Sequence, residues 1–288
     1  MRAREDARRA AVKIGSEALL EVRGLGKEFA QRRTFSRTRF AVRAFEDVNL
    51  TIRRGTTLAL VGESGAGKST LARCLALLEK PTRGEIRFEG ANLPALRKRE
   101  LFSVRRKIQM IFQDPTSALN PGMSAAEIIM EPLVIQRIGT KEGRQARALE
   151  LMESVALPAA SASKGPLEFS GGQRQRLAIA RALALEPSLL ILDEACSGLD
   201  LRSQELILEL LGRLQRTLGM TFLYVSHDLR SVAEFADEIA VMKDGRIVEQ
   251  KPAAELFENP EHAYTRELLA AMPSMETICA GRLTEAAL

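Results

Sequence analysis

Short apolar runs alternate with longer amphipathic stretches along most of the chain. Four apolar runs predict buried strands: residues 57–64 (TLALVGES), 107–113 (KIQMIFQ), 189–194 (LLILDE) and 221–227 (TFLYVSH). Continuous apolar strands separated by helices are typical of a parallel sheet that is covered on both faces. The pattern therefore predicts an α/β fold.

A long helix is predicted over residues 201–219. Asp200 is a good N-cap residue directly before it, and Gly219 ends it. Leucines four residues apart predict its buried face: Leu206, Leu210, Leu214 and Leu218.

Two further stretches break the alternation of strands and helices. Residues from 114 to about 181 are helical and polar, with a loose segment at 158–166, and predict a helical lobe inserted between two core strands. Residues 238–250 form two short strand patterns around Asp244 and Gly245, which predicts a β-hairpin.

Composition narrows the class of protein. The 288 residues are 45% hydrophobic and 27% charged, which excludes a disordered chain. The net charge of +5 suggests nucleic acid at first, but residues 1–43 hold twelve Lys and Arg against five Asp and Glu. The remaining 245 residues hold 30 against 32, so the main body is nearly neutral. For the Arg-rich segment 31–43 we favour a solvated hairpin over contact with anionic lipid.

Cysteine usage and the N-terminal sequence indicate a reducing, intracellular compartment. Cys74, Cys196 and Cys279 are odd in number and far apart, so neither a disulfide framework nor a zinc site is expected. The first twenty residues lack the apolar region of a signal peptide, and the longest aliphatic runs, such as 189–192, are too short for a membrane span. We expect a soluble intracellular chain whose membrane role, if it has one, depends on partners.

The strongest motif is GESGAGKS at residues 62–69, between a predicted strand and a predicted helix. Its glycines let backbone N–H groups close around phosphate oxygens, and the helix N-terminus favours anions. Lys68 would reach the β- and γ-phosphates, and the Ser69 hydroxyl would bind Mg²⁺. The sequence predicts a P-loop whose nucleotide-binding residues are Gly62, Ser64, Gly65, Gly67, Lys68, Ser69 and Thr70.

Two acidic residues, Asp193 and Glu194, end the strand predicted at 189–194. Beside a P-loop, the first carboxylate would hold Mg²⁺ and the second would orient the attacking water. Adjacent residues of a strand point to opposite faces, so the two carboxylates can serve different partners.

Together with these motifs, the segment FSGGQ at 169–173 resembles the signature of the ATP-binding subunits of ABC transporters. That family usually has Leu where this chain has Phe169. The resemblance covers residues 19–270 and implies a P-loop ATPase core with an antiparallel β subdomain and an inserted helical subdomain. It also implies a head-to-tail dimer, in which the signature meets the γ-phosphate held by the opposite subunit. The signature residues are Ser170, Gly171, Gly172 and Gln173.

The same resemblance assigns four further positions. Gln113 corresponds to the glutamine that touches Mg²⁺ and water and couples the nucleotide to membrane subunits. Asp200 ends the segment that corresponds to the family's D-loop, residues 197–200, although the family more often has Ala where this chain has Gly198. His227 corresponds to the switch histidine that contacts the γ-phosphate. Phe29 is the candidate for stacking on adenine, with Phe40 as its rival.

Residues 110–121 and 258–273 resemble the oligopeptide, dipeptide and nickel importer ATPases. Some of those relatives carry a C-terminal iron–sulfur centre, but Cys279 alone cannot hold one, so none is expected. The resemblance divides the chain into a basic tail (1–18), an ATP-binding domain (19–252, with the helical subdomain at about 114–181) and a C-terminal extension (253–288).

The resemblance implies an ATPase, with ATP and Mg²⁺, that powers uptake of peptides or a related small solute such as nickel. Its expected partners are a second ABC ATPase subunit, identical or different, two transmembrane permeases and, indirectly, an extracytoplasmic solute-binding protein. The chain would lie on the cytoplasmic face of the membrane and bind no nucleic acid. An exporter ATPase, a non-transport ATPase acting on nucleic acid, and a nucleotide-gated partner without turnover stay open as alternatives.

Overall fold

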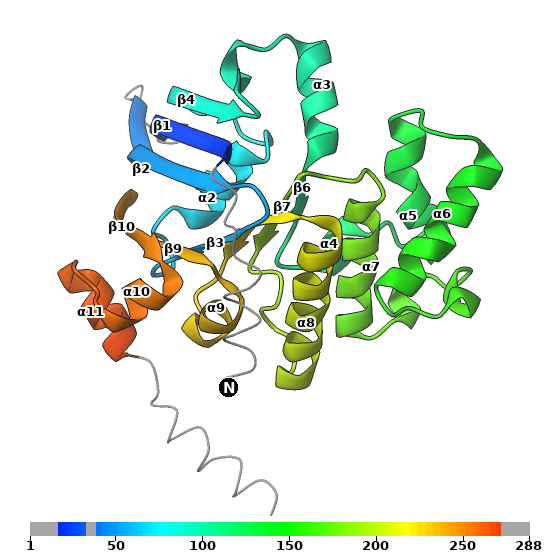
Figure 1. Cartoon of the computed structure of the whole chain (residues 1–288). Helices are drawn as coiled ribbons and strands as arrows, with labels where there is room; N and C mark the ends of the chain where they lie inside the picture. The colour runs from blue at the N-terminus through cyan, green and yellow to red at the C-terminus, as the bar shows by residue number, and fades with distance from the viewer. Residues whose placement is uncertain (1–16, 33–38, 272–288) are drawn as a thin grey trace, which may run out of the picture.

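The computed structural model describes residues 17–32 and 39–271 (Figure 1). The basic N-terminal tail to residue 16, the tip of the Arg-rich hairpin and Cys279 lie outside these residues. The strands are β1 Ala18–Arg32, β2 Arg39–Arg53, β3 Thr57–Val61, β4 Arg83–Phe88, β5 Ala91–Asn92, β6 Ile108–Ile111, β7 Leu189–Asp193, β8 Thr221–Val225, β9 Glu238–Lys243 and β10 Arg246–Pro252. The α-helices are α2 Lys68–Leu75, α3 Lys98–Lys107, α4 Pro115–Ala118, α5 Ala125–Ile135, α6 Lys141–Ser154, α7 Gly171–Leu183, α8 Leu201–Leu218, α9 Leu229–Phe235, α10 Ala253–Glu258 and α11 Ala263–Ala270.

A six-stranded sheet forms the centre of the molecule, in the order β10-β9-β3-β8-β7-β6. The strands from β9 to β6 are parallel to their neighbours, and β10 pairs antiparallel with β9. The predicted α/β class is therefore confirmed. Because β3, β6, β7 and β8 run in one direction, the segments that follow them meet at one edge of the sheet.

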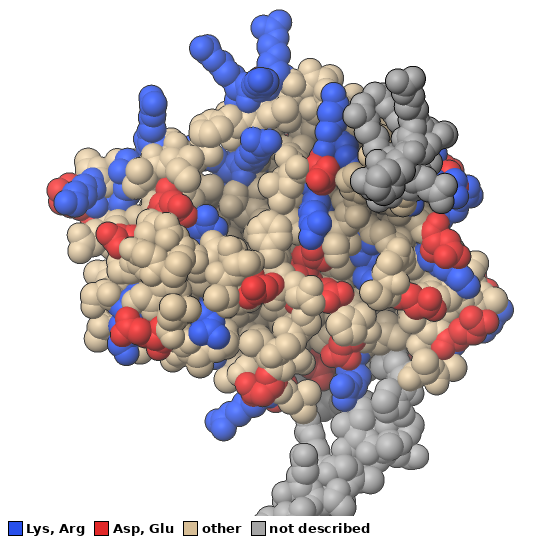
Figure 2. Space-filling model, turned by 180° about the vertical axis from the view of Figure 1, so that it is seen from behind, with Lys and Arg blue, Asp and Glu red and all other residues tan. Residues whose placement is uncertain are grey.

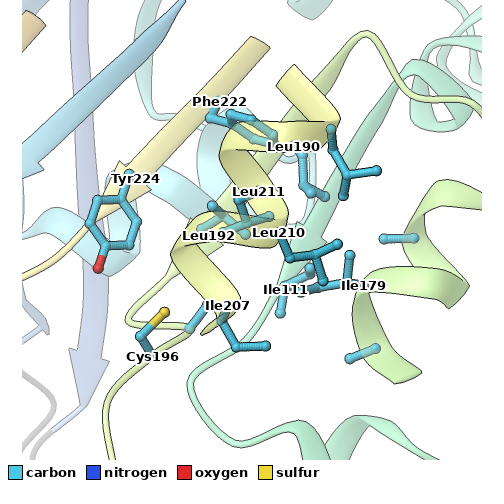
Figure 3. Close-up of a cluster of buried hydrophobic side chains, with 14 of the residues drawn as sticks. Ile111, Ile179, Leu190, Leu192, Cys196, Ile207, Leu210, Leu211, Phe222 and Tyr224 are labelled. Carbon is cyan, nitrogen blue, oxygen red and sulfur yellow. The ribbon is translucent and has the colours of Figure 1, made fainter. Parts of the chain in front are cut away.

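Strands β3, β7 and β8 of this sheet are buried on both faces, as their apolar sequences predict. Along β8, Phe222 and Tyr224 face one core, whereas Leu223 and Val225 face the other. The first core also receives side chains from α7 and α8 (Figure 3). It contains Cys196, and the second core contains Cys74. Burial raises the pKa of both thiols to about 11, so both are neutral at physiological pH and pack as apolar groups.

The buried face of α8 differs from the predicted leucine stripe. Leu210 and Leu214 are each 4% exposed, as predicted, but Leu206 is 42% and Leu218 is 62% exposed. An α-helix has about 3.6 residues per turn, so positions four apart drift by about 40° at each step and leave the core. Ile207 and Leu211 fill the face instead. The predicted ends are correct: the Asp200 carboxylate accepts a hydrogen bond from Ser203 N, and Gly219 caps the helix with φ 64°.

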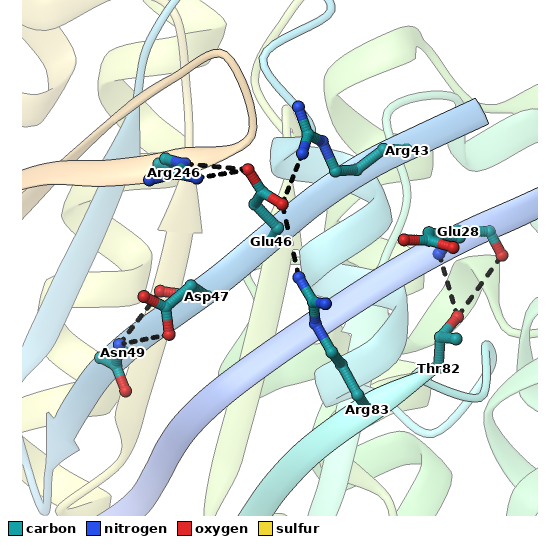
Figure 4. Close-up of polar contacts among 8 residues, drawn as sticks. All are labelled: Glu28, Arg43, Glu46, Asp47, Asn49, Thr82, Arg83 and Arg246. Atoms are coloured by element: carbon teal, nitrogen blue, oxygen red, sulfur yellow. Dashed lines mark hydrogen bonds and ion pairs between the residues drawn. The ribbon is translucent and has the colours of Figure 1, made fainter. Parts of the chain in front are cut away.

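A second, antiparallel sheet has the order β2-β1-β4-β5. It packs on β3 and α2 through the second core (Figure 1). One carboxylate joins three strands there: Glu46 of β2 forms ion pairs with Arg43 of the same strand (2.5 Å), Arg83 of β4 (3.4 Å) and Arg246 of β10 (Figure 4). The hydrogen bond from Arg246, which outweighs partial burial, holds the pKa of Glu46 below its usual range. The cluster ties the antiparallel sheet to the β9–β10 hairpin, whose turn at Asp244 and Gly245 has the predicted positive φ angles.

Between β6 and β7 the chain forms α4 to α7, which is the predicted helical insertion (Figure 1). At the other end of the chain, α10 and α11 lie beside β9 and β10 and bury Leu256 and Tyr264. Within residues 17–32 and 39–271, no helix combines the length and the apolar character needed to cross a membrane.

The charge on the surface is mixed. Figure 2 shows, on the face seen from behind, Lys and Arg side chains that reach out from the end of the molecule where α3 lies, with acidic and basic side chains interspersed elsewhere. Helix α3 buries no residue, and its basic residues are Lys98, Arg99, Arg105, Arg106 and Lys107. On this face, the Lys and Arg side chains that project furthest gather at the α3 end and do not line a groove.

Candidate functional site

The loop after β3 is held against backbone on two sides. Gly62 has φ +148°, and a Cβ there would lie 2.1 Å from the Met242 carbonyl oxygen. Gly67 has φ +100°, and its Cβ would lie 2.5 Å from the carbonyl oxygen of Ala44. Both contacts are with backbone, which cannot move aside as a flexible side chain can. The loop therefore requires glycine at these two positions.

Lys68 begins α2 and turns its side chain back into the loop. Its Nζ donates to the carbonyl oxygens of Gly62 and Glu63, at 2.8 Å each, and the residue is 5% exposed. Burial lowers the pKa of Lys68, while the nearby carboxylates of Asp193 and Glu194 act in the opposite direction. The ammonium group is thus oriented within the loop before any phosphate arrives.

The next residue, Ser69, contacts the end of β7. Its Oγ donates to Asp193 Oδ1 at 2.9 Å, and Asp193 is 4% exposed. Burial raises the pKa of Asp193, and the Ser69 hydroxyl partly offsets that effect. A hydroxyl and a carboxylate side by side are the oxygen ligands that Mg²⁺ takes when phosphate oxygens and water complete its shell. The donor set therefore fits magnesium.

Glu194 follows Asp193 but leaves the strand. Its φ is +50°, its backbone N–H donates to the Val225 carbonyl at 3.0 Å, and its Oε1 lies 3.4 Å from His227 Nδ1. The prediction that the two carboxylates serve different partners is consistent with these contacts, but its reason was wrong. The left-handed backbone at Glu194, rather than strand alternation, separates them, and strain of this kind is concentrated at functional sites.

The remaining predicted residues of this edge lie in or next to the same segments. Ser64 and Gly65 form the exposed turn of the loop, and Thr70 is half-buried in the first turn of α2. Gln113 is exposed just after β6, on the edge where β3, β7 and β8 end. The fold thus brings the segments that carry the loop, Asp193, Glu194, His227 and Gln113 to one edge of the sheet.

The segment at 170–173 forms a separate group at the start of α7. Ser170 is the N-cap: its Oγ accepts from Gln173 N at 3.3 Å, and Gln173 Oε1 accepts from Ser170 N at 2.9 Å. A Cβ on Gly172 would lie 3.1 Å from Ser203 Oγ, so the segment lies against the start of α8. The contacts described for these residues stay within α7 and the neighbouring loop and helix.

Asp200 belongs to this second group. Its carboxylate accepts hydrogen bonds from Ser203 N at 2.9 Å and from Ser203 Oγ at 2.6 Å. Since Ser203 is also the neighbour of Gly172, the segments 170–173 and 197–200 form one continuous surface. These hydrogen bonds cap α8 and stabilise its first turn.

Phe29 lies in β1, opposite Val42 of β2. Lys27 Nζ is 4.6 Å from the centre of its ring, so a cation already lies over one ring face. The side chain of Phe40, the alternative candidate, lies outside the described parts of the chain.

Sequence reasoning missed one residue at the loop. Tyr264 of α11 accepts a hydrogen bond from Glu63 N at 3.0 Å. The resemblance to importer ATPases marks the segment 258–273 but assigns no role to Tyr264. The available signal was that the chain has only two tyrosines, one of them in that segment.

Comparison with protein families identifies two regions. Residues 45–197 match the model described as ABC transporter, and residues 248–284 match the model described as oligopeptide/dipeptide transporter, C-terminal region. The first region begins within β2, at Phe45, and runs through the loop after β3 to Ser197. The second includes the whole of α10 and α11.

Individual curated proteins and solved structures that resemble this chain are also ATP-binding proteins of the ABC type. The chain is 48% identical over 259 residues to the probable peptide ABC transporter ATP-binding protein y4tS of Sinorhizobium fredii, covering 90% of this chain and 73% of that protein. It is 45% identical to the oligopeptide transport ATP-binding protein OppF of Bacillus subtilis, covering 90% and 83%. A solved dimeric ATP-binding cassette in a post-hydrolysis state, bound to ADP and phosphate, matches with a TM-score of 0.72 and 32% identity, covering 81% of this chain and 98% of that one.

Proposed function

The chain belongs to the ABC transporter family of ATP-binding proteins, and from that premise we propose that it hydrolyses ATP to power the import of peptides or a related small solute. The observation that carries the chemistry is the convergence of Lys68, Ser69, Asp193, Glu194 and His227 at one edge of the sheet. The choice of import rests on the C-terminal match and on relatives named for peptide transport.

The loop after β3 binds the phosphates of ATP. Glycine at positions 62, 65 and 67 leaves the backbone N–H groups open to phosphate oxygens, and α2 directs its N-terminus towards them. Lys68 exchanges its two carbonyl contacts for phosphate oxygens. Magnesium, held by Ser69, Asp193 and Gln113, would neutralise developing negative charge on the phosphates.

Glu194 and His227 act on the bond that breaks. The Glu194 carboxylate orients a water molecule and accepts its proton as the water oxygen attacks the γ-phosphorus, while the bond from that phosphorus to the β,γ-bridging oxygen breaks. His227, 3.4 Å from Glu194 and largely exposed, donates a hydrogen bond to the γ-phosphate. The strained backbone at Glu194 keeps its carboxylate near that histidine.

The group at 170–173 completes the site of a second subunit. Gly171 and Gly172 at the start of α7 offer backbone N–H groups to a γ-phosphate bound in another chain's loop. Asp200 lies on the same surface and would face that loop. Two ATP molecules are then enclosed between two ATPase subunits, which are identical or closely similar.

Two permease subunits supply the membrane path, a proposal supported by relatives named as ATP-binding proteins of peptide transporters. In this arrangement the chain lies peripherally on the cytoplasmic face, and Gln113 transmits the state of the nucleotide to the permeases. A solute-binding protein outside the membrane delivers the cargo without touching this chain.

The test is to purify the chain with its two permeases in lipid vesicles and measure ATP hydrolysis with and without candidate solutes. We expect oligopeptides or dipeptides, presented by a solute-binding protein outside, to stimulate hydrolysis and to accumulate inside. Stimulation by lipids or drugs that move outwards would identify an exporter instead. Salt-sensitive binding of the chain to nucleic acid, with no solute response, would contradict transport.

A further inference from the structure

The C-terminal segment reaches the nucleotide loop through one side chain. Tyr264 of α11 is 3% exposed, and its hydroxyl accepts the Glu63 backbone N–H at 3.0 Å across 201 positions of the chain. Its ring belongs to the main core cluster, and Lys243 Nζ lies 4.5 Å from the ring centre. Both ring and hydroxyl are therefore fixed, and the contact joins two regions that match different family models.

The residue that receives this contact also orients Lys68. The carbonyl oxygen of Glu63 accepts from Lys68 Nζ at 2.8 Å and from Ala66 N at 3.2 Å. Tyr264 thus binds the N–H of a residue whose carbonyl holds the phosphate-binding lysine. Without the tyrosine hydroxyl, the Glu63 N–H would lose this partner, and the loop would be held less tightly at Glu63.

Helix α11 cannot shift independently of the sheet. The carboxylate of Glu249, on β10, accepts from the backbone N–H groups of Glu261 at 2.9 Å and His262 at 3.0 Å, just before α11 begins. Burial would raise the pKa of Glu249, but these hydrogen bonds outweigh burial and lower it, so the group stays ionised. Lys251 adds an ion pair to Glu261 at 2.7 Å. The tyrosine is therefore presented to the loop from a fixed support.

We propose that Tyr264 is a positioning residue for ATP binding and that it couples the C-terminal segment 253–271 to the nucleotide loop. Docking of the segment holds the loop in the form that accepts phosphate. By linkage, bound nucleotide strengthens the docking of the segment to the same extent. The proposal rests on the proposed function only in requiring that the loop bind ATP.

The test compares the chain's two tyrosines. Tyr264→Phe removes the hydroxyl and keeps the ring. Tyr224→Phe is the matched control, because Tyr224 is also buried and its hydroxyl is bonded elsewhere. It donates to Ser231 Oγ at 3.0 Å. We expect Tyr264→Phe to raise the Kd for ATP about threefold to tenfold, the cost of one net hydrogen bond, with little change in kcat at saturating ATP. Tyr224→Phe should lower the melting temperature and leave the Kd unchanged.

A second measurement distinguishes positioning from packing alone. In the wild-type chain, ADP should slow hydrogen exchange of the amides in α11, and in Tyr264→Phe this protection should be lost. Equal ATP affinity in the two chains together with unchanged protection would overturn the proposal. A wild-type chain that fails to bind ATP would instead overturn the proposed function, so the two failures are distinguishable.

Discussion

The two halves of the proposed ATP site are built in opposite ways within one chain. The P-loop group (62–70 with Asp193, Glu194 and His227) is held by contacts between residues far apart in sequence, such as Ser69 with Asp193. The two segments of the signature group (170–173 and 197–200) are each held by local hydrogen bonds, such as Ser170 with Gln173, and they pack together where Gly172 meets Ser203. The first group depends on the whole fold, whereas the second forms with its helices and leaves its surface open to another subunit.

The two groups also differ in electrostatic cost. Burial lowers the pKa of Lys68 and raises that of Asp193, so in each case the charged form is disfavoured before ligand binds. In the signature group, Asp200 caps α8, and its hydrogen bonds with Ser203 hold its pKa low. We infer that the P-loop group gives up stability for binding, and that the signature group contributes stability to its helices.

The largest expected effect is on turnover. Glu194→Gln keeps the size of the side chain but removes the base, so kcat should fall by about 100-fold to 10,000-fold. ATP should still bind, and an ATP-bound dimer should accumulate, visible by size-exclusion chromatography. Glu209→Gln, on the exposed face of α8, is the control. Turnover at the wild-type rate would show that Glu194 has no such role.

Lys68→Ala tests binding in the same group. Loss of a charge-assisted contact worth about 1.5–3 kcal/mol should weaken ATP binding by about tenfold to a hundredfold. The control is Lys98→Ala, because that lysine is exposed on α3. Affinity measured by isothermal titration decides the matter, and unchanged affinity would count heavily against the P-loop assignment.

Ser170→Asp separates the two roles of the signature serine. Aspartate caps helices as well as serine does, so stability should stay near that of the wild type. A negative charge facing the partner's phosphate should nevertheless lower hydrolysis by about tenfold or more, with ATP affinity of the isolated subunit unchanged. Wild-type hydrolysis would reduce Ser170 to a structural cap.

Mixing the last two variants tests whether the halves come from different chains. A dimer of one Lys68→Ala chain and one Ser170→Asp chain contains one intact site, formed by the loop of the second and the signature of the first. Hydrolysis by the mixture should exceed the sum of the separate variants. If hydrolysis by the mixture does not exceed that sum although each variant still dimerises, two copies of this chain do not share an ATP site. Either the native partner is a different ATPase subunit, or the ATP site lies within one chain.

The parts predicted well from sequence are those with local causes. The apolar runs predicted the strands that end at or just before Asp193 and His227, and the parallel sheet to which they belong, because strands buried on both faces are continuous in apolar residues. The hairpin at Asp244 and Gly245 followed from the φ angles that its turn requires.

The parts missed depend on tertiary contacts. The backbone turn at Glu194 follows from its bond to the Val225 carbonyl of β8, which no local pattern encodes. One miss had a local cause instead: a four-residue spacing drifts from the 3.6-residue period of the helix, so Leu210 and Leu214 of α8 are buried while Leu206 and Leu218 are exposed. The contact of Tyr264 with the loop joins positions 201 residues apart and follows only from the packing of α11 on β10.

The smallest expected effect is on the stability of the ligand-free protein, where substitutions of Asp193 and Asp200 should act in opposite directions. Asp193→Asn should match or exceed wild-type stability at neutral pH, because it removes a buried charge that the fold disfavours. Since the folded pKa of Asp193 is raised above 3.8, this cost disappears as pH falls through that raised pKa, and the advantage of the variant should shrink. Asp200→Ala should instead lose about 1 kcal/mol, the usual cost of removing a helix cap. Thermal unfolding at neutral and mildly acidic pH measures both. A clear loss of stability in Asp193→Asn would contradict the view that the P-loop group gives up stability for binding.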